Sequence, residues 1–88
     1  MKINKNFVLR EVAGNWVALP IGVSMADFSG MLTLNESGAF LWRCLEEHAD
    51  EKMLVDALCR EYFVDRLQAR ADVEEFLGIL ESAGCLET

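Results

Sequence analysis

The hydrophobic pattern of this chain changes its period once, near Asn35, and this change constrains the fold more than any other feature. Before Asn35, apolar residues occur in short β-rich runs that glycine, proline and asparagine interrupt. After Asn35, apolar residues recur at helical spacing almost to the end of the chain. A chain in which the strands precede the helices, instead of alternating with them, is typical of an α+β domain.

A β-hairpin is predicted near the start of the chain. Residues 7–12 and 16–19 are rich in aliphatic and aromatic side chains, and the segment 13–15 between them contains the glycine and asparagine that short turns favour. Pro20 closes the second run, because a proline cannot donate a hydrogen bond to a neighbouring strand. We therefore expect two antiparallel strands joined by a short turn.

A third short strand is predicted over residues 30–34, after a loop at residues 22–29. Because side chains alternate across a strand, Leu32 and Leu34 lie on one face of it. Together with the hairpin, this strand forms a three-stranded antiparallel sheet that has one apolar face to bury.

Three amphipathic helices are predicted to cover that face. The first begins at Asn35, a strong N-cap, or at Thr33, which opens an alternative capping box. The second begins near Asp50, and the third begins after Asp65 and ends at Gly84. A helical pair joined by a short break, here Val64-Asp65, is also the layout of a winged helix-turn-helix. The apolar residues with the spacing of buried helix faces are Phe40, Leu41, Trp42, Cys44, Leu45, Met53, Leu54, Ala57, Leu58, Tyr62, Ala69, Val73, Phe76, Leu77 and Leu80.

The length of 88 residues predicts a single domain over residues 1–88. Its net charge of −7 is unevenly distributed: residues 1–35 hold three basic and two acidic residues, whereas residues 36–88 hold five basic and thirteen acidic residues. The acidic helices favour solubility and disfavour nucleic acid as a partner. No stretch is long enough to span a membrane, and Arg10 and Glu11 interrupt the apolar run of a secretion signal, so we expect a cytoplasmic protein without a membrane partner.

No motif for an enzyme or for a bound cofactor is present. The three cysteines are widely spaced and His48 is the only histidine, so a zinc site would need unusual carboxylate ligands. Cys44 and His48 have the spacing of a contacting pair on a helix, but Cys44 belongs to an apolar stripe and no third group orients the histidine. These observations predict a non-catalytic chain that has no cofactor and no metal.

Two functions fit this layout. A winged-helix DNA-binding regulator would use residues 66–82 as its recognition helix, but that segment holds two arginines against four acidic residues, which DNA phosphates repel. Peptide binding is the other function, because the third strand is short, lies at a sheet edge and carries no charge at residues 31–34. An extended peptide can add to such an edge as a further strand. From the pattern alone, the chain's own loop or a second copy of the chain can cover the edge equally well.

Three segments, residues 7–14, 30–42 and 82–87, carry a resemblance to a known family. The most specific of them contains Leu-Thr-Leu-Asn-Glu-Ser-Gly-Ala at residues 32–39. In these segments the chain resembles the PqqD family of RiPP recognition elements, which are also called peptide chaperones. The resemblance extends over essentially the whole chain, whereas the acidic helices are generic.

The resemblance implies a non-catalytic adaptor with three strands and three helices. Such an adaptor captures the leader of a ribosomally synthesised precursor peptide on its third strand and presents it to a modifying enzyme, which is a radical SAM enzyme in pyrroloquinoline quinone synthesis. Residues 25–30 look more like those of stand-alone PqqD-like proteins, so the resemblance does not specify the cognate peptide. The implied peptide-binding residues are Gly30, Met31, Leu32, Thr33, Leu34, Arg66, Arg70, Val73 and Leu77.

In the implied site, the peptide lies between the third strand and the third helix. A hydrophobic leader residue would enter between Leu32 or Leu34 and Val73, and Arg70 would pair with a carboxylate of the leader. The implied partners are the leader peptide and a radical SAM enzyme. An open sheet edge in so small a domain also allows a homodimer.

Overall fold

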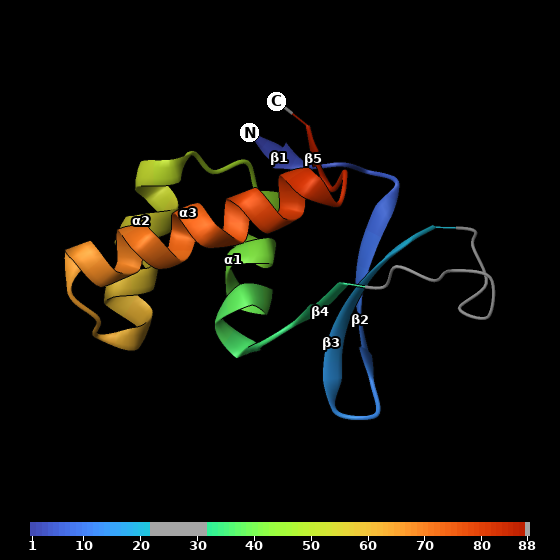
Figure 1. The fold of residues 1–88 in the computed structure, drawn as a ribbon, viewed down its shortest axis with the longest axis horizontal. Helices are drawn as coiled ribbons and strands as arrows, with labels where there is room; N and C mark the ends of the chain where they lie inside the picture. The colour runs from blue at the N-terminus through green and yellow to red at the C-terminus, as the bar shows by residue number, and fades with distance from the viewer. Residues whose placement is uncertain (22–31, 88) are drawn as a thin grey trace.

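The computed structural model describes residues 1–21 and 32–87, which Figure 1 shows as a ribbon. Strands β2 (Phe7–Val12), β3 (Asn15–Pro20) and β4 (Leu32–Leu34) form a sheet in the order β2-β3-β4. Both neighbouring pairs are antiparallel, so the predicted three-stranded antiparallel sheet is confirmed.

Part of the predicted third strand and the loop before it fall outside the described residues. These are residues 22–31, which include the first two positions of the expected strand, 30 and 31. The described part of the strand, Leu32–Leu34, lies where the sequence predicts it and runs directly into the first helix. Leu34 is buried, Leu32 is half-buried and Thr33 is exposed, which is the alternation that the sequence predicts.

The turn between β2 and β3 is shorter than the predicted segment 13–15. Asn15 pairs with Val12, so Ala13 and Gly14 alone form the turn, and both have positive φ angles, 52° and 83°. Two successive positive φ angles are typical of a type I′ turn, whose twist matches that of the flanking strands. A two-residue turn of this type also fixes which backbone groups of the strands face each other.

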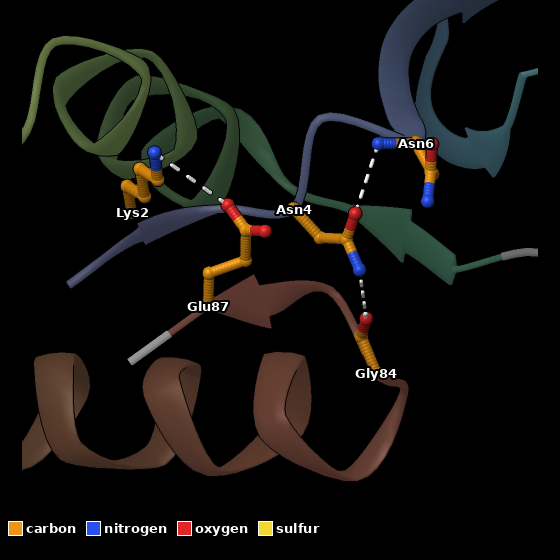
Figure 2. A network of polar contacts seen from close by, with 5 residues as sticks. All are labelled: Lys2, Asn4, Asn6, Gly84 and Glu87. Atoms are coloured by element: carbon orange, nitrogen blue, oxygen red, sulfur yellow. Dashed lines mark hydrogen bonds and ion pairs between the residues drawn. The ribbon is translucent and has the colours of Figure 1, made fainter.

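A second, smaller sheet joins the two ends of the described chain. Strands β1 (Lys2–Ile3) and β5 (Leu86–Glu87) pair antiparallel, and the Nζ atom of Lys2 lies 3.7 Å from a carboxylate oxygen of Glu87 (Figure 2). The sequence pattern did not predict this sheet, because strands of two residues have no periodicity to recognise. Leu86, two residues after Gly84, pairs with Ile3.

The side chain of Asn4 connects this small sheet to the rest of the fold. Its Nδ2 atom donates a hydrogen bond to the carbonyl oxygen of Gly84 at 3.4 Å, and its Oδ1 atom accepts one from the N–H of Asn6 at 2.9 Å (Figure 2). The N–H of Asn4 also donates to the carbonyl oxygen of Cys85 at 2.7 Å. The start of the chain is thereby held against the end of the last helix.

Three helices follow the sheet, as predicted: α1 (Glu36–Glu46), α2 (Glu51–Tyr62) and α3 (Arg66–Ser82). Each begins after a side chain that accepts a hydrogen bond from the backbone N–H three residues later, at 2.8 Å, which satisfies a donor of the first turn. The three predicted N-caps are confirmed: Asn35, Asp50 and Asp65. The alternative start of the first helix at Thr33 is wrong, because Thr33 belongs to β4.

Helix α3 is followed by a Schellman motif, in which Gly84 is the C′ residue. The N–H of Cys85 donates to the carbonyl oxygen of Leu80 at 2.9 Å, and the N–H of Gly84 donates to that of Glu81 at 3.1 Å. The φ angle of Gly84 is 76°, a left-handed conformation that glycine adopts without steric cost. This reversal directs the chain from α3 into β5.

The core lies between the sheet and the helices, and most of the predicted apolar stripe is buried in it. Met53 and Tyr62 are exceptions: they lie near the two ends of α2 and are 53% and 38% exposed. The ring of Tyr62 packs edge-on against Phe40 at 5.7 Å between ring centroids. Six large side chains with less than 2% exposure form the centre of the core: Trp42, Leu45, Leu54, Val73, Leu80 and Cys85.

No helix within the described residues is long and apolar enough to cross a membrane.

One glycine inside α3 and one directly after its C-cap provide a matched test of the Schellman motif. Gly84→Ala should lower the free energy of unfolding by about 1–2 kcal/mol, because a Cβ disfavours the left-handed conformation. Gly78→Ala, in the exposed middle of the helix where an added Cβ has nothing within 4 Å, should raise it by about 0.5–1 kcal/mol. Urea denaturation followed by circular dichroism measures both. Equal destabilisation by the two substitutions would contradict the Schellman assignment.

Candidate functional site

A groove of about 290 Å³ lies between β4, the first turn of α1 and one face of α3. All three residues of β4 line it. Asp72, Glu75, Phe76 and Ile79 line it from α3, and their spacing of three or four residues places them on one helix face. The first two helices and the N-cap complete the lining with Asn35, Ser37, Gly38, Leu41 and Leu58.

Apolar side chains from β4 and α3 meet at the floor of the groove, because α1 begins close to both elements. At Gly38, a Cβ atom would lie 3.1 Å from Asn35 Oδ1, 3.4 Å from Leu34 Cβ and 3.6 Å from Phe76 Cε1. The Oδ1 atom of Asn35 accepts hydrogen bonds from the N–H of Gly38 at 2.8 Å and from the hydroxyl of Ser37 at 3.1 Å. The cap is thus satisfied internally, and Gly38 leaves room for Leu34 and Phe76.

The pattern of hydrogen bonds in the hairpin determines which backbone groups reach the sheet edge. In a hairpin with a two-residue turn, the residues that flank the turn form a hydrogen-bonded pair, and bonded and non-bonded pairs then alternate along the strands. Val12 and Asn15 are the flanking pair here. The N–H of Ile21 donates to the carbonyl oxygen of Asn6 at 2.7 Å, a bonded pair that fits this alternation.

The same alternation assigns the backbone groups of β4. Trp16 and Ala18 direct their backbone groups towards β4, where they face Leu34 and Leu32. Thr33 faces Val17 in a non-bonded pair. The N–H and the C=O of Thr33 therefore point away from β3, towards an edge that no other described strand covers.

The groove wall on α3 is negatively charged. Asp72 and Glu75 line it, and neither a lysine nor an arginine is among the described lining residues. The Oδ1 atom of Asp72 accepts a hydrogen bond from Nε2 of Gln68 at 2.8 Å, which orients the carboxylate without neutralising it. The groove thus combines an apolar floor, a strand edge and two carboxylates.

The predicted site residues of the third strand divide between the groove and the undescribed segment. Leu32, Thr33 and Leu34 line the groove. Gly30 and Met31 lie outside the described residues. The described strand residues therefore lie beside α3, as the sequence predicts. The face of α3 that they meet is not the face that carries the four predicted binding residues.

The four predicted residues of α3 do not line the groove. Val73 is fully buried in the core, and Leu77 is half-buried against it. An oxygen of Asp56 lies 2.7 Å from Nη1 of Arg66, and the hydrogen bond between them raises the pKa of the guanidinium. A binding role for these four residues stays a prediction, since their side chains lie on other faces of α3.

Arg70 is engaged away from the groove. Its Nε atom lies 3.4 Å from a carboxylate oxygen of Glu74, one helical turn further along the same helix. Together with Arg66 and Leu67, Arg70 lines a separate hollow of about 350 Å³ between α2 and α3. The expected pairing of Arg70 with a carboxylate of a bound peptide therefore does not fit a peptide in the groove.

The sequence contained a signal for the face of α3 that does line the groove. Asp72, Glu75 and Ile79 recur at the spacing of a helix face that borders the predicted core stripe, and Phe76 belongs to both faces. The sequence reading missed this face because charged residues next to an apolar stripe are usually solvated.

The other reactive side chains that the sequence singled out are cysteines and a histidine outside the groove. Within the described residues, no group of three or more histidine, cysteine or acidic side chains is placed to hold a metal ion. Burial is the main cause that raises the pKa of the thiols of Cys44 and Cys85, so both are neutral, weakly nucleophilic groups at neutral pH.

Comparison with known proteins identifies a family and solved structures that are similar to this chain. Residues 15–86 match the family model described as "Coenzyme PQQ synthesis protein D (PqqD)". The chain is 31% identical to TbiB1 in its complex with the TbiA(beta) leader peptide, with a TM-score of 0.77 over 99% of this chain and 95% of TbiB1. No curated protein matches the chain.

A second solved structure supports the fold alone. It is the lasso peptide synthetase B1 complexed with the leader peptide, which is 17% identical to this chain. The TM-score is 0.76, and the match covers 99% of this chain and 96% of the synthetase. The fold of three helices and a three-stranded antiparallel sheet is thus the same in both structural relatives.

The charge of α3 predicts that duplex DNA does not bind. Both arginines of this helix already pair with carboxylates, and it carries four acidic residues that repel phosphates. Titration of the protein into a fluorescently labelled duplex at low salt should leave the anisotropy unchanged. Saturable binding that weakens as salt is added would contradict this prediction and favour a winged-helix regulator.

Proposed function

This chain belongs to the PqqD family, and we propose that it is a non-catalytic adaptor that binds the leader of a ribosomally synthesised precursor peptide. The observation that carries the proposal is Thr33, whose backbone N–H and C=O face a sheet edge beside the groove that no described strand covers. An extended peptide at this edge forms two backbone hydrogen bonds with Thr33 and extends the sheet by one strand. The leader complex of TbiB1, a relative of similar fold, supports this reading.

The groove supplies what backbone hydrogen bonds cannot supply, namely selectivity for side chains. Alternate side chains of an added strand point to the same face of the sheet, so every second peptide residue faces the groove. Leu32, Phe76 and Ile79 offer apolar surface there, and Ile79 is 43% exposed before any peptide binds. Burial of one large apolar side chain contributes about 1.5–3 kcal/mol, which makes a hydrophobic leader residue the main anchor.

In this proposal the bound leader is presented to a separate modifying enzyme, a radical SAM enzyme, in the cytoplasm. Holding the leader at the sheet edge leaves the following part of the precursor free to enter the active site of that enzyme. The adaptor then acts by raising the effective concentration of the precursor at the enzyme, without chemistry of its own.

Thr33→Pro should weaken leader binding by about tenfold or more, because proline removes the edge-facing N–H and leaves a peptide carbonyl without its donor. Thr33→Val is the matched control: it removes the hydroxyl, keeps the N–H and should change the affinity less than about twofold. The probe is a labelled synthetic leader of the cognate precursor, which is to be sought among the genes that neighbour this chain's gene, and the measurement is fluorescence anisotropy.

Both variants should remain folded, because the N–H of Thr33 makes no hydrogen bond to β3. Far-UV circular dichroism and urea denaturation check this. Equal leader affinity of the proline and valine variants would rule out strand addition at β4. In the wild-type chain, the leader should shift the backbone NMR signals of residues 32–34 and 72–79, and shifts confined to the hairpin turn would argue against the groove.

Modification of the full precursor by its modifying enzyme should require the wild-type adaptor. With limiting precursor, Thr33→Pro should reduce the yield of modified peptide, as measured by mass spectrometry, to that of a reaction without adaptor. A large excess of precursor should restore the yield, because the adaptor contributes effective concentration only. Equal yields with and without the wild-type chain at limiting precursor would contradict the presentation step.

A further inference from the structure

We propose that the groove selects peptides in which a lysine or arginine stands two residues away from a large apolar residue. This inference rests on the proposed function, because it specifies which peptides the same groove takes. It follows from the charges on the α3 wall and from the geometry of a strand added beside Thr33.

The charges of α3 are distributed unequally around the helix. On the faces away from the groove, its two arginines pair with Asp56 and with Glu74. On the groove face, Asp72 and Glu75 form no ion pair with any described residue, and the hydrogen-bond donor to Asp72 is the neutral side chain of Gln68. Of the three α3 carboxylates that form no ion pair among the described residues, Asp72, Glu75 and Glu81, the first two line the groove.

The position of these carboxylates makes them more selective than ordinary surface charges. Asp72 is half-buried, and Phe76 and Leu32 form apolar surface in the same groove. A bound peptide displaces water from this surface, which strengthens the attraction between a carboxylate and a nearby cation. Lysine and arginine fit such a rim well, because their methylene stems pack on apolar surface while their charged ends reach the carboxylates.

The spacing of the two features defines the peptide pattern. Asp72 and Phe76 are four residues apart on α3, which corresponds to about 6 Å along the helix axis. Alternate residues of an extended peptide are about 6.6 Å apart and point to the same face. A strand that runs along α3 therefore places one side chain over Phe76 and Ile79, and the side chain two residues away against Asp72 and Glu75.

This pattern has the opposite charge to that expected from the sequence. A pairing of Arg70 with a peptide carboxylate would favour acidic leaders, but Arg70 lies outside the groove and pairs with Glu74. An acidic residue next to the apolar anchor would instead face Asp72 and Glu75, and like charges at this distance repel. The groove thus accepts a basic residue at this position and disfavours an acidic one.

Selection from a displayed library of random peptides tests the inference without knowledge of the natural leader. The immobilised baits are the full-length wild type, Thr33→Pro, the double variant Asp72→Asn/Glu75→Gln, and a matched control, Glu74→Gln/Glu81→Gln. The control removes two carboxylates from the same helix, but outside the groove lining. Asparagine at position 72 keeps an oxygen that can accept the hydrogen bond from Gln68.

Wild type and control should enrich peptides that have a basic and an apolar residue two positions apart, in either order. The groove double variant should keep the apolar preference and lose the basic one. For a synthetic peptide of the enriched pattern, the double variant should bind about three- to tenfold more weakly at low salt, and added salt should remove most of this difference.

The outcomes separate the inference from the proposed function. If Thr33→Pro abolishes enrichment but the wild-type peptides carry no basic preference, or the groove double variant keeps it, the charge inference is wrong and strand addition stands. If Thr33→Pro enriches the same peptides as the wild type, or the wild type enriches none, strand addition at β4 is wrong and the inference falls with it.

Discussion

The backbone hydrogen-bond alternation that starts at the two-residue turn of Ala13 and Gly14 is the constraint on which the candidate site depends. This turn makes Val12 and Asn15 a bonded pair, and the register passes that alternation through β3 to β4. The edge-facing role of Thr33 is therefore decided more than fifteen residues earlier in the chain. A slip of β3 by one residue against β2 would reverse this alternation and would direct the backbone groups of Leu32 and Leu34 to the edge instead.

The groove depends on the position of α3, which is set by its packing against α2 and by contacts at its C-terminal end. The Schellman motif at Gly84 turns the chain into β5, and β5 pairs with β1 at the start of the chain. Near the middle of α3, Phe76 packs close to Gly38, where a Cβ would press on the Asn35 cap. The cap of α1, the end of β4 and the middle of α3 thus depend on one another, since a change in any of them alters the groove floor.

The sequence predicted local features well, because local features have local causes. Asn35, Asp50 and Asp65 cap helices through their own side chains, and Gly84 ends α3 through its own conformation. Pairing of β1 with β5 joins distant residues and leaves no periodic trace. The face of α3 that lines the groove differs from the face predicted to bind the peptide, because periodicity identifies the buried stripe but not which neighbouring face meets β4. Val73, one of the predicted binding residues, lies in the buried stripe.

The acidity of the helical half now has two separable physical consequences. On the outer faces of α3 and α2, carboxylates pair with arginines and contribute to solubility. At Asp72 and Glu75 the same type of charge lies beside an apolar floor, where it repels phosphate and attracts ammonium or guanidinium groups. A helix in the position of a winged-helix recognition helix is thereby suited to a cationic extended peptide and unsuited to DNA. Its selectivity comes from where two carboxylates lie, and the net charge of the chain does not reveal that placement.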